Sequence, residues 1–302
     1  MLTVLQTALE VGLIYGLVAL ALFISLSTDG CFTLGCAVGA MLTIAGHPIL
    51  ALFAAMAAGM LSGYVTAFLQ TRLGVESILA GIISNTGLYT INLAVMGFSS
   101  NVSITGVDTV FSLFKGLVGG PWSRLILLAL IVAVIAFALI RFFGTSLGLS
   151  IRATGDSLDM VSASSINPKA TITIGLCLAN ALTALSGCLI GEYNKFCDIN
   201  LGTGMVTIAL ASLIIGEVFA GHRGGVGKRV VCVVLGSIVY RFIIALALRL
   251  NISAEYFKLV SAVIVAVAIA APNMKGYVHL AKIKSNARKL RALSGKGDET
   301  DA

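Results

Sequence analysis

Long apolar runs separated by short polar segments dominate the chain. Each run is long enough to cross the roughly 30 Å hydrocarbon core of a bilayer. The second and seventh are short and rich in glycine, as is typical of broken or re-entrant helices. The pattern predicts an all-α polytopic membrane protein with about nine transmembrane helices, at 5–27, 30–47, 49–71, 77–97, 123–143, 170–192, 204–221, 229–249 and 256–272.

One polar segment, 148–170, interrupts this pattern between the fifth and sixth runs. Asp156 or Ser157 can cap a first helical turn, and Asn167-Pro168 ends the helical pattern. Apolar residues follow the cap at roughly helical spacing, at Leu158, Val161 and Ile166. The segment is therefore predicted to hold a short amphipathic helix, which we expect to contact another protein.

A second polar segment, 98–123, is predicted to form an external loop with an amphipathic stretch around Val110–Leu117. Two interpretations of this stretch are equally consistent with its residues. It either docks an external partner or forms an interfacial helix that rests on lipid.

The chain weakly repeats itself. The first run leads into residues 29–35 and a helix of small residues, and the sixth leads into residues 198–202 and a similar helix. The third and eighth runs end in Arg72-Leu73 and Arg249-Leu250, each followed by an acid. We therefore expect an inverted four-helix repeat, spans 1–4 and 6–9, joined by span 5 and a cytoplasmic helix.

Composition supports the membrane assignment. The 302 residues are 58% hydrophobic and 11% charged, and a soluble domain of this size would need more polar surface. No P-loop, HExxH or GxSxG motif is present, and the six cysteines show no CxxC spacing. The sequence therefore predicts a non-enzyme without a metal or cofactor of its own.

Basic residues predict the orientation. The positive-inside rule places the C-terminus and 148–170 in the cytoplasm and the N-terminus outside. We expect a transmembrane domain over 1–273, a basic cytoplasmic tail over 274–302, and no nucleic-acid binding. The predicted cytoplasmic side receives seven basic residues of the tail and Arg72, Arg141, Arg152, Lys169, Arg223, Lys228 and Arg229.

Charged residues within the apolar runs must avoid lipid. For Glu217 and Arg241 the simplest interpretation is pairing with each other, or with backbone, between two spans, and for Asp29 it is a helix cap. Glu10 and Glu192 are alternative proton-relay candidates. The candidate structural positions of the apolar runs are Asp29, Gly30, Gly35 and Arg241.

Polar and aromatic residues within the runs are candidates for a translocation path. Asparagines inside apolar helices either hydrogen-bond between helices or line a water-filled route, and tyrosines either stack on a substrate or belong to an interfacial belt. The candidate path residues are Asn85, Tyr89, Asn92, Asn180 and Glu217.

Six motifs along the chain carry a resemblance to a known family. They are residues 8–15, 28–35, 79–83, 152–156, 180–187 and 216–217. Together they resemble the permease subunits of bacterial ATP-binding-cassette (ABC) importers. The branched-chain amino-acid/ribose permease superfamily, and within it the tryptophan/tyrosine-type subgroup, is the most similar. Its usual Asp-Leu-Ser-Val-Gly turn is replaced by residues 29–33, which argues against a sugar permease.

This resemblance implies a homodimer in the bacterial plasma membrane, with cytoplasmic ABC ATPase subunits that hold ATP and Mg²⁺ and an external substrate-binding lipoprotein. The solute would be an aromatic amino acid or a related small organic compound. By position, the ATPase-coupling residues would be Arg152, Ala153, Thr154, Gly155, Asp156, Ser157, Leu158, Asp159, Val161, Asn167 and Pro168.

A second interpretation needs no partner. A stand-alone ion-coupled secondary transporter would use Glu10, Glu192 or Glu217 as its proton or sodium site. Inverted repeats occur in that class as well.

Overall fold

The computed structural model describes residues 2–25, 29–120, 122–164, 166–221 and 225–249, together with 262, 263 and 266. Most of the ninth predicted run and the whole basic tail lie outside these residues. The elements are α1 Leu2–Ile24, α2 Asp29–Ile44, α3 Pro48–Thr71, α4 Ser77–Val95, β1 Asn101–Ser103, α5 Val110–Val118, α6 Ser123–Phe143, α7 Ser146–Asp156, α8 Leu158–Ala163, α9 Pro168–Asn194, β2 Phe196–Asp198, α10 Met205–Ala220 and α11 Val226–Arg249.

Long apolar helices confirm the predicted class of an all-α polytopic membrane protein. Within the described residues, six helices are long and apolar enough to cross a membrane: α1, α3, α4, α6, α9 and α11. The helices α2 and α10 are apolar but shorter. They correspond to the second and seventh runs, which were predicted to be short, and this prediction is confirmed. The predicted number of nine spans is not confirmed.

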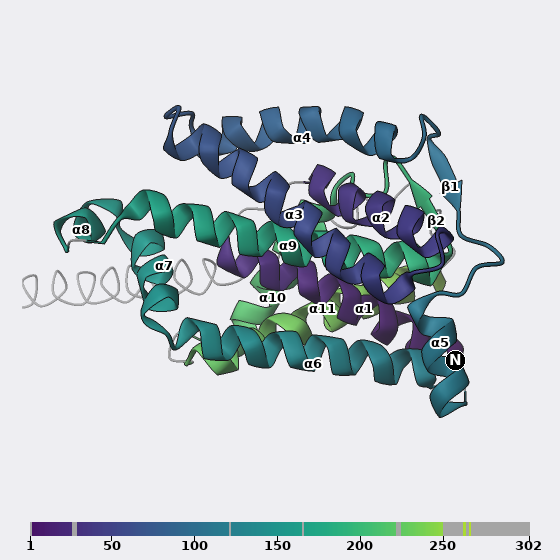
Figure 1. The fold of residues 1–302 in the computed structure, drawn as a ribbon. Helices are drawn as coiled ribbons and strands as arrows, with labels where there is room; N and C mark the ends of the chain where they lie inside the picture. Colours follow the sequence, from purple (N-terminus) through teal and green to yellow (C-terminus); the bar gives the residue numbers. More distant parts are fainter. Residues whose placement is uncertain are drawn as a thin grey trace, which may run out of the picture.

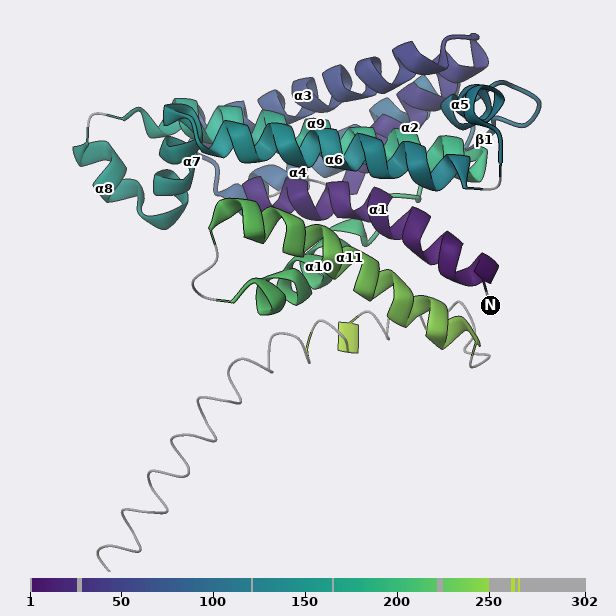
Figure 2. The ribbon, with the colours of Figure 1, turned by 90° about the horizontal axis from the view of Figure 1, so that it is seen from below.

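Helix α9 is the central element of the bundle. It packs against α1, α2 and α3, while α4 lies outside α2 and α3 on one flank, and α10 and α11 pack beside α1 on the other (Figures 1 and 2). We call the end that carries α8 the α8 end. The opposite end, where β1 pairs antiparallel with β2, is the ribbon end.

Small residues bring the central helices into backbone contact. A Cβ atom at Gly35 of α2 would overlap the carbonyl of Ala184 in α9, and one at Gly187 of α9 would overlap the carbonyl of Phe32. Such close approach is how helices associate where apolar burial alone gives no preference over lipid. The structural role expected for Gly35 is therefore this contact.

Helices α2 and α10 both begin inside the bundle. Cys31, in the first turn of α2, donates its thiol to the carbonyl of Asn180 near the middle of α9. Side-chain bonds and glycine contacts show that α2 runs parallel to α9, whereas α10 runs antiparallel to α11 and hence to α9. The two short helices therefore start close together and run towards opposite ends, α2 to the ribbon end and α10 to the α8 end.

Candidate functional site: a protruding helix pair and a polar junction

Helices α7 and α8 form one unit that protrudes at the α8 end (Figure 1). The Thr145 hydroxyl caps α7 by accepting from Gly148 N at 3.3 Å. Ser157 ends α7 and also caps α8, because its extended backbone breaks the helix and its hydroxyl accepts from Met160 N at 3.4 Å. The predicted short helix is thus confirmed, with Ser157 as its cap, while Asp156 closes α7.

The predicted end of this segment is wrong. Asn167 and Pro168 do not stop a helix but begin α9, where Asn167 Oδ1 accepts from Lys169 N at 3.1 Å and Pro168 occupies the first helical position. Proline suits that position because the first-turn N–H groups have no partner within the helix. Helix α8 ends at Ala163, before Ile166.

The helix pair is anchored to the bundle by its inward face. Thr154 of α7 and Thr171 of α9 share a hydrogen bond of 2.9 Å between their hydroxyls. Val161, the buried apolar residue of α8, is 2% exposed. Because α7 follows α6 directly and α8 leads into α9 within a few residues, a displacement of α7 and α8 acts on both spans.

Several side chains of the pair are exposed, and we call the surface that they form, on whichever side of the two helices, the outward face. It combines apolar and charged side chains. Leu158 is 52% exposed and Met160 is 67% exposed, although they lie beyond the ends of the spans. Leu158 belongs to the predicted apolar stripe, and it also lines the cleft described below. Arg152, Asp156 and Asp159 of the same two helices are also exposed. Such a surface is typical of a protein contact site.

A cleft of about 210 Å³ lies behind this surface. It separates the helix pair from the α8-end termini of α1, α3 and α4. The lining residues are Ile24, Ser25, Gln70, Ser77, Ile151, Thr154, Gly155, Leu158, Thr171, Ile172 and Gly175.

Asp29 holds the starts of the two short helices together. Its carboxylate accepts from Gly204 N at 3.0 Å and from Val206 N at 2.9 Å. Asp29 is therefore a helix cap, as predicted, but the helix that it caps is α10, whose N-terminal dipole favours a negative charge. A bond of 3.1 Å from Gly202 N to the Thr33 hydroxyl reinforces the contact.

Two of the candidate path residues meet at the same place. Asn85 and Asn92 of α4 both bond the backbone of Gly30: Asn85 Oδ1 accepts from Gly30 N at 2.6 Å, and Asn92 Nδ2 donates to Gly30 O at 3.0 Å. We call Asp29, Gly30, Asn85 and Asn92 the polar junction. Within the described part of the chain, Asn92 Oδ1 is buried without a hydrogen bond. Asn180 lies next to the junction, since its carbonyl accepts the Cys31 thiol.

The remaining candidates lie elsewhere. Tyr89 is exposed on α4, and Glu217 is exposed near the end of α10, away from the start that Asp29 caps. The expected Glu217–Arg241 pair is wrong: among the described residues neither forms an ion pair, and Arg241 instead lies over the Tyr15 ring at 5.2 Å. The α10–α11 register places Val233 beside Gly216, so Arg241 is about 12 Å further along α11.

The two proton-relay candidates are both hydrogen-bonded near the ribbon end. Glu10 is 3% exposed and accepts from Gln6 Nε2 and the Tyr193 hydroxyl, each at 2.9 Å. Glu192 is 1% exposed and accepts from the Thr43 hydroxyl at 3.0 Å and from Val110 N at 2.9 Å. Glu192 thus joins α9 to α2 and to the start of α5.

The segment 98–123, predicted as an external loop, contains the predicted amphipathic helix as α5. Thr109 and Ser112 form a capping box, and Val110 and Phe111 are buried while Leu117 is 86% exposed. Strand β1 of the same loop pairs with β2, a contact that the sequence analysis missed because three-residue strands carry too little periodicity.

Two further residues of the protruding helix pair and its anchor were not predicted from the sequence. Met160 is more exposed than Leu158 on α8, and Thr171 anchors α7. Met160 could have been found as a large apolar residue within a short capped helix of a polar segment. Thr171 could not, because its partner lies 17 residues away on another helix.

Comparison with known proteins agrees with this architecture. Residues 3–269 match the family described as branched-chain amino acid transport system / permease component. The chain is 30% identical over 275 residues to a tyrosine transport system permease protein of Clostridioides difficile (strain R20291), covering 91% of this chain and 89% of that protein. It is 29% identical over 277 residues to the uncharacterized protein RP368 of Rickettsia prowazekii (strain Madrid E), covering 88% and 96%.

No solved structure matches the chain significantly. The family match spans all the helices from α1 to α11, and it therefore includes both the protruding helix pair and the polar junction. The chain belongs to the branched-chain amino acid transport system / permease component family.

Proposed function

We propose that the chain is the membrane-spanning subunit of an ABC importer, and that α7 and α8 form its coupling element. The observation that carries the proposal is the outward face of this pair, where Leu158 and Met160 are exposed beyond the spans of a transport-system permease. A separate ATPase that binds this face would move α6 and α9 together, because the pair is continuous with both spans. ATP and Mg²⁺ would reside in the ATPase.

The α8 end is then the cytoplasmic end. Its described basic residues include Arg72, Arg152, Lys169 and Lys228, as the positive-inside rule requires. The ribbon end, with α5, would face outwards and receive a substrate-binding lipoprotein. The subunit would reside in a bacterial plasma membrane with its N-terminus outside and its C-terminus inside.

The polar junction would border the translocation path. Asn85 and Asn92 of the junction, with Tyr89, Asn180 and Glu217, remain the proposed path residues. The opposite directions of α2 and α10 support an inverted repeat in which α1–α3 correspond to α9–α11. The path would be completed by a second copy of the subunit.

The solute would be an aromatic amino acid or a related small organic compound. The named function of the Clostridioides difficile relative makes tyrosine the first compound to test. Selectivity would depend mainly on the external binding protein.

Purification from the native host tests the class of transporter. A tagged chain should copurify with a P-loop ATPase, and vesicles holding the complex should accumulate tyrosine only when ATP is supplied to the α8-end side. Uphill uptake by vesicles that hold this chain alone, driven by a proton or sodium gradient, would establish the ion-coupled alternative and refute the importer.

A further inference from the structure

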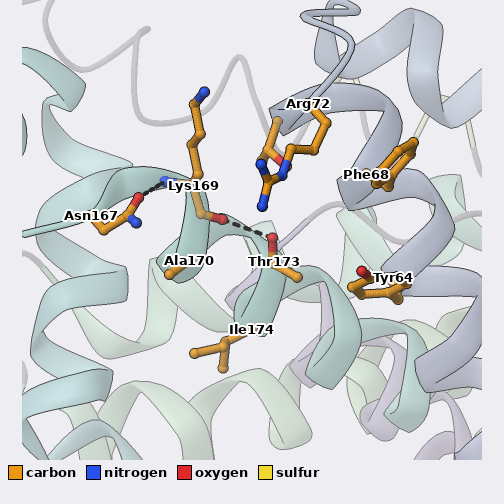
Figure 3. Close-up of a pocket in the computed structure, with 9 residues that line it drawn as sticks. Tyr64, Phe68, Arg72, Asn167, Lys169, Ala170, Thr173 and Ile174 are labelled. Atoms are coloured by element: carbon orange, nitrogen blue, oxygen red, sulfur yellow. Dashed lines mark hydrogen bonds between the residues drawn. The ribbon is translucent and has the colours of Figure 1, made fainter.

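A second cavity, of about 420 Å³, lies between α3 and α9 at the α8 end (Figure 3). This volume is within the range of ligand pockets, about 300–1,000 Å³. The cavity is separate from the outward face of α8 and from the polar junction. Its walls are formed by Tyr64, Phe68, Thr71, Arg72, Asn167, Lys169, Ala170, Thr173 and Ile174.

The charged side chains of the cavity are both cationic. Arg72 follows the last residue of α3, and Lys169 lies in the first turn of α9. In Figure 3 the Arg72 guanidinium points towards Thr173, which also lines the cavity. Across the described residues neither cationic group has a hydrogen bond or an ion pair, and the lining includes no acid. The cavity therefore favours an anion.

The position of the cations indicates the depth of that anion. Arg72 directly follows the candidate span Pro48–Thr71, and Lys169 is the second residue of the candidate span Pro168–Asn194. Both cations therefore lie where hydrocarbon gives way to headgroups. Free cationic side chains at this depth are suited to lipid phosphates.

An apolar stripe continues from the cavity along α3. Leu61, Tyr64, Val65 and Phe68 are between 45% and 68% exposed, and their spacing places them on one face of the helix. Tyr64 and Phe68 also line the cavity. A ligand with an anionic head and a long apolar chain would match both features, whereas a free anion would use only the first.

We propose that this cavity binds the headgroup of an anionic glycerophospholipid, with the phosphate between Arg72 and Lys169 and an acyl chain along the α3 stripe. The site would fill from the same leaflet as the α8 end. The proposal requires only that the α8 end lie at headgroup level. It therefore does not depend on whether ATP or an ion gradient drives transport.

Native mass spectrometry of the delipidated full chain tests the headgroup. Phosphatidylglycerol should bind about 30-fold more tightly than phosphatidylcholine with the same acyl chains, since each of the two cations near a headgroup contributes about fivefold. The double variant Arg72→Gln/Lys169→Gln should lower this preference to about twofold or less. Lys228→Gln, an exposed cation at the same end, should keep it. Equal binding of the two lipids by the unaltered chain, or an equal loss in Lys228→Gln, would overturn the proposal.

A second measurement leaves both cations in place and tests the acyl chain. Trp122 is the only tryptophan, so Tyr64→Trp in a Trp122→Phe chain gives a single fluorescent reporter in the cavity. Phosphatidylglycerol with brominated acyl chains should quench it at lower concentration than brominated phosphatidylcholine, and glycerol phosphate should not relieve the quenching. Equal quenching by both lipids, or full competition by glycerol phosphate, would contradict a lipid site.

Discussion

Among single residues, Asp29 joins the starts of two helices that lie far apart in the chain. It is the first residue of α2, yet its carboxylate bonds backbone groups 175 and 177 residues later, at the start of α10. A partly buried pair of N–H groups at a helix start is costly to leave without an acceptor. Asp29 therefore stabilises the contact between the starts of α2 and α10, two helices that are far apart in the sequence.

Replacing Asp29 should destabilise the protein. Asp29→Ala removes both acceptors and the charge at the α10 start, and we expect a loss of about 1–2 kcal/mol in unfolding free energy. Asp29→Asn keeps one acceptor oxygen, so its unfolding free energy should lie between that of the unaltered protein and that of the Asp29→Ala variant. Thermal unfolding in detergent measures the effect.

The matched control is Asp108→Ala, because Asp108 is exposed and accepts one bond from the Ser112 hydroxyl. Its cost should stay within about 0.5 kcal/mol. Equal melting temperatures for the Asp29→Ala and Asp108→Ala variants would show that the α10 cap contributes nothing.

Single residues also show where sequence reasoning stops. Asp29 was predicted to be a cap from its type and its place between apolar runs, but nothing local could identify α10 as the helix. The Glu217–Arg241 pairing failed for a related reason: opposite charges on adjacent spans meet only when the hairpin register aligns them, and here Gly216 faces Cys232 and Val233.

At the scale of elements, the bundle depends on the close approach of α2 and α9. Their backbones touch at Gly35 and Gly187, so these helices tolerate no Cβ atom there. Helix α4 is the contrasting case. At Gly81 of α4 an added Cβ atom would meet nothing within 4 Å.

Two alanine substitutions should therefore have opposite signs. Gly35→Ala should lower the unfolding free energy by about 1–3 kcal/mol, because backbone rather than a flexible side chain must shift. Gly81→Ala should leave it unchanged or raise it by up to about 1 kcal/mol, since alanine is the better helix former. Denaturation of both variants in one detergent compares them. A Gly35→Ala protein as stable as Gly81→Ala would contradict the packing described for α2 and α9.

Element ends were harder to predict than element positions. Eight apolar runs coincide with described helices because their length and hydropathy are strong signals. Asn167-Pro168 was assigned to the end of one helix although an N-cap asparagine followed by proline is also the signature of a helix start. The structure shows that it begins α9.

At the scale of the whole molecule, the two ends of the bundle differ in kind. The α8 end carries the protruding helix pair and the cationic cavity, whereas the ribbon end carries α5 and the two strands. The proposed function assigns the first end to the cytoplasm. The charge pattern of the sequence led to the same assignment, because basic residues are excluded from one side during insertion.

Cysteine labelling tests this orientation. The described cysteines are free and, apart from partly exposed Cys177, buried, so the unaltered chain should react little with a membrane-impermeant maleimide. In intact cells Leu117→Cys on α5 should react and Ser162→Cys on α8 should not. Inverted vesicles should show the reverse, and labelling of Ser162→Cys from outside the cell would contradict the proposed topology.

The most direct test of ATP-driven coupling through α8 is tyrosine uptake into vesicles that hold the complete complex. The double variant Leu158→Ser/Met160→Ser removes the exposed apolar contact, and uptake should fall at least about tenfold while the melting temperature of the subunit stays the same. Ser162→Ala, on the same exposed helix, should transport like the unaltered protein. Undiminished ATP-driven uptake by the double variant would contradict the account.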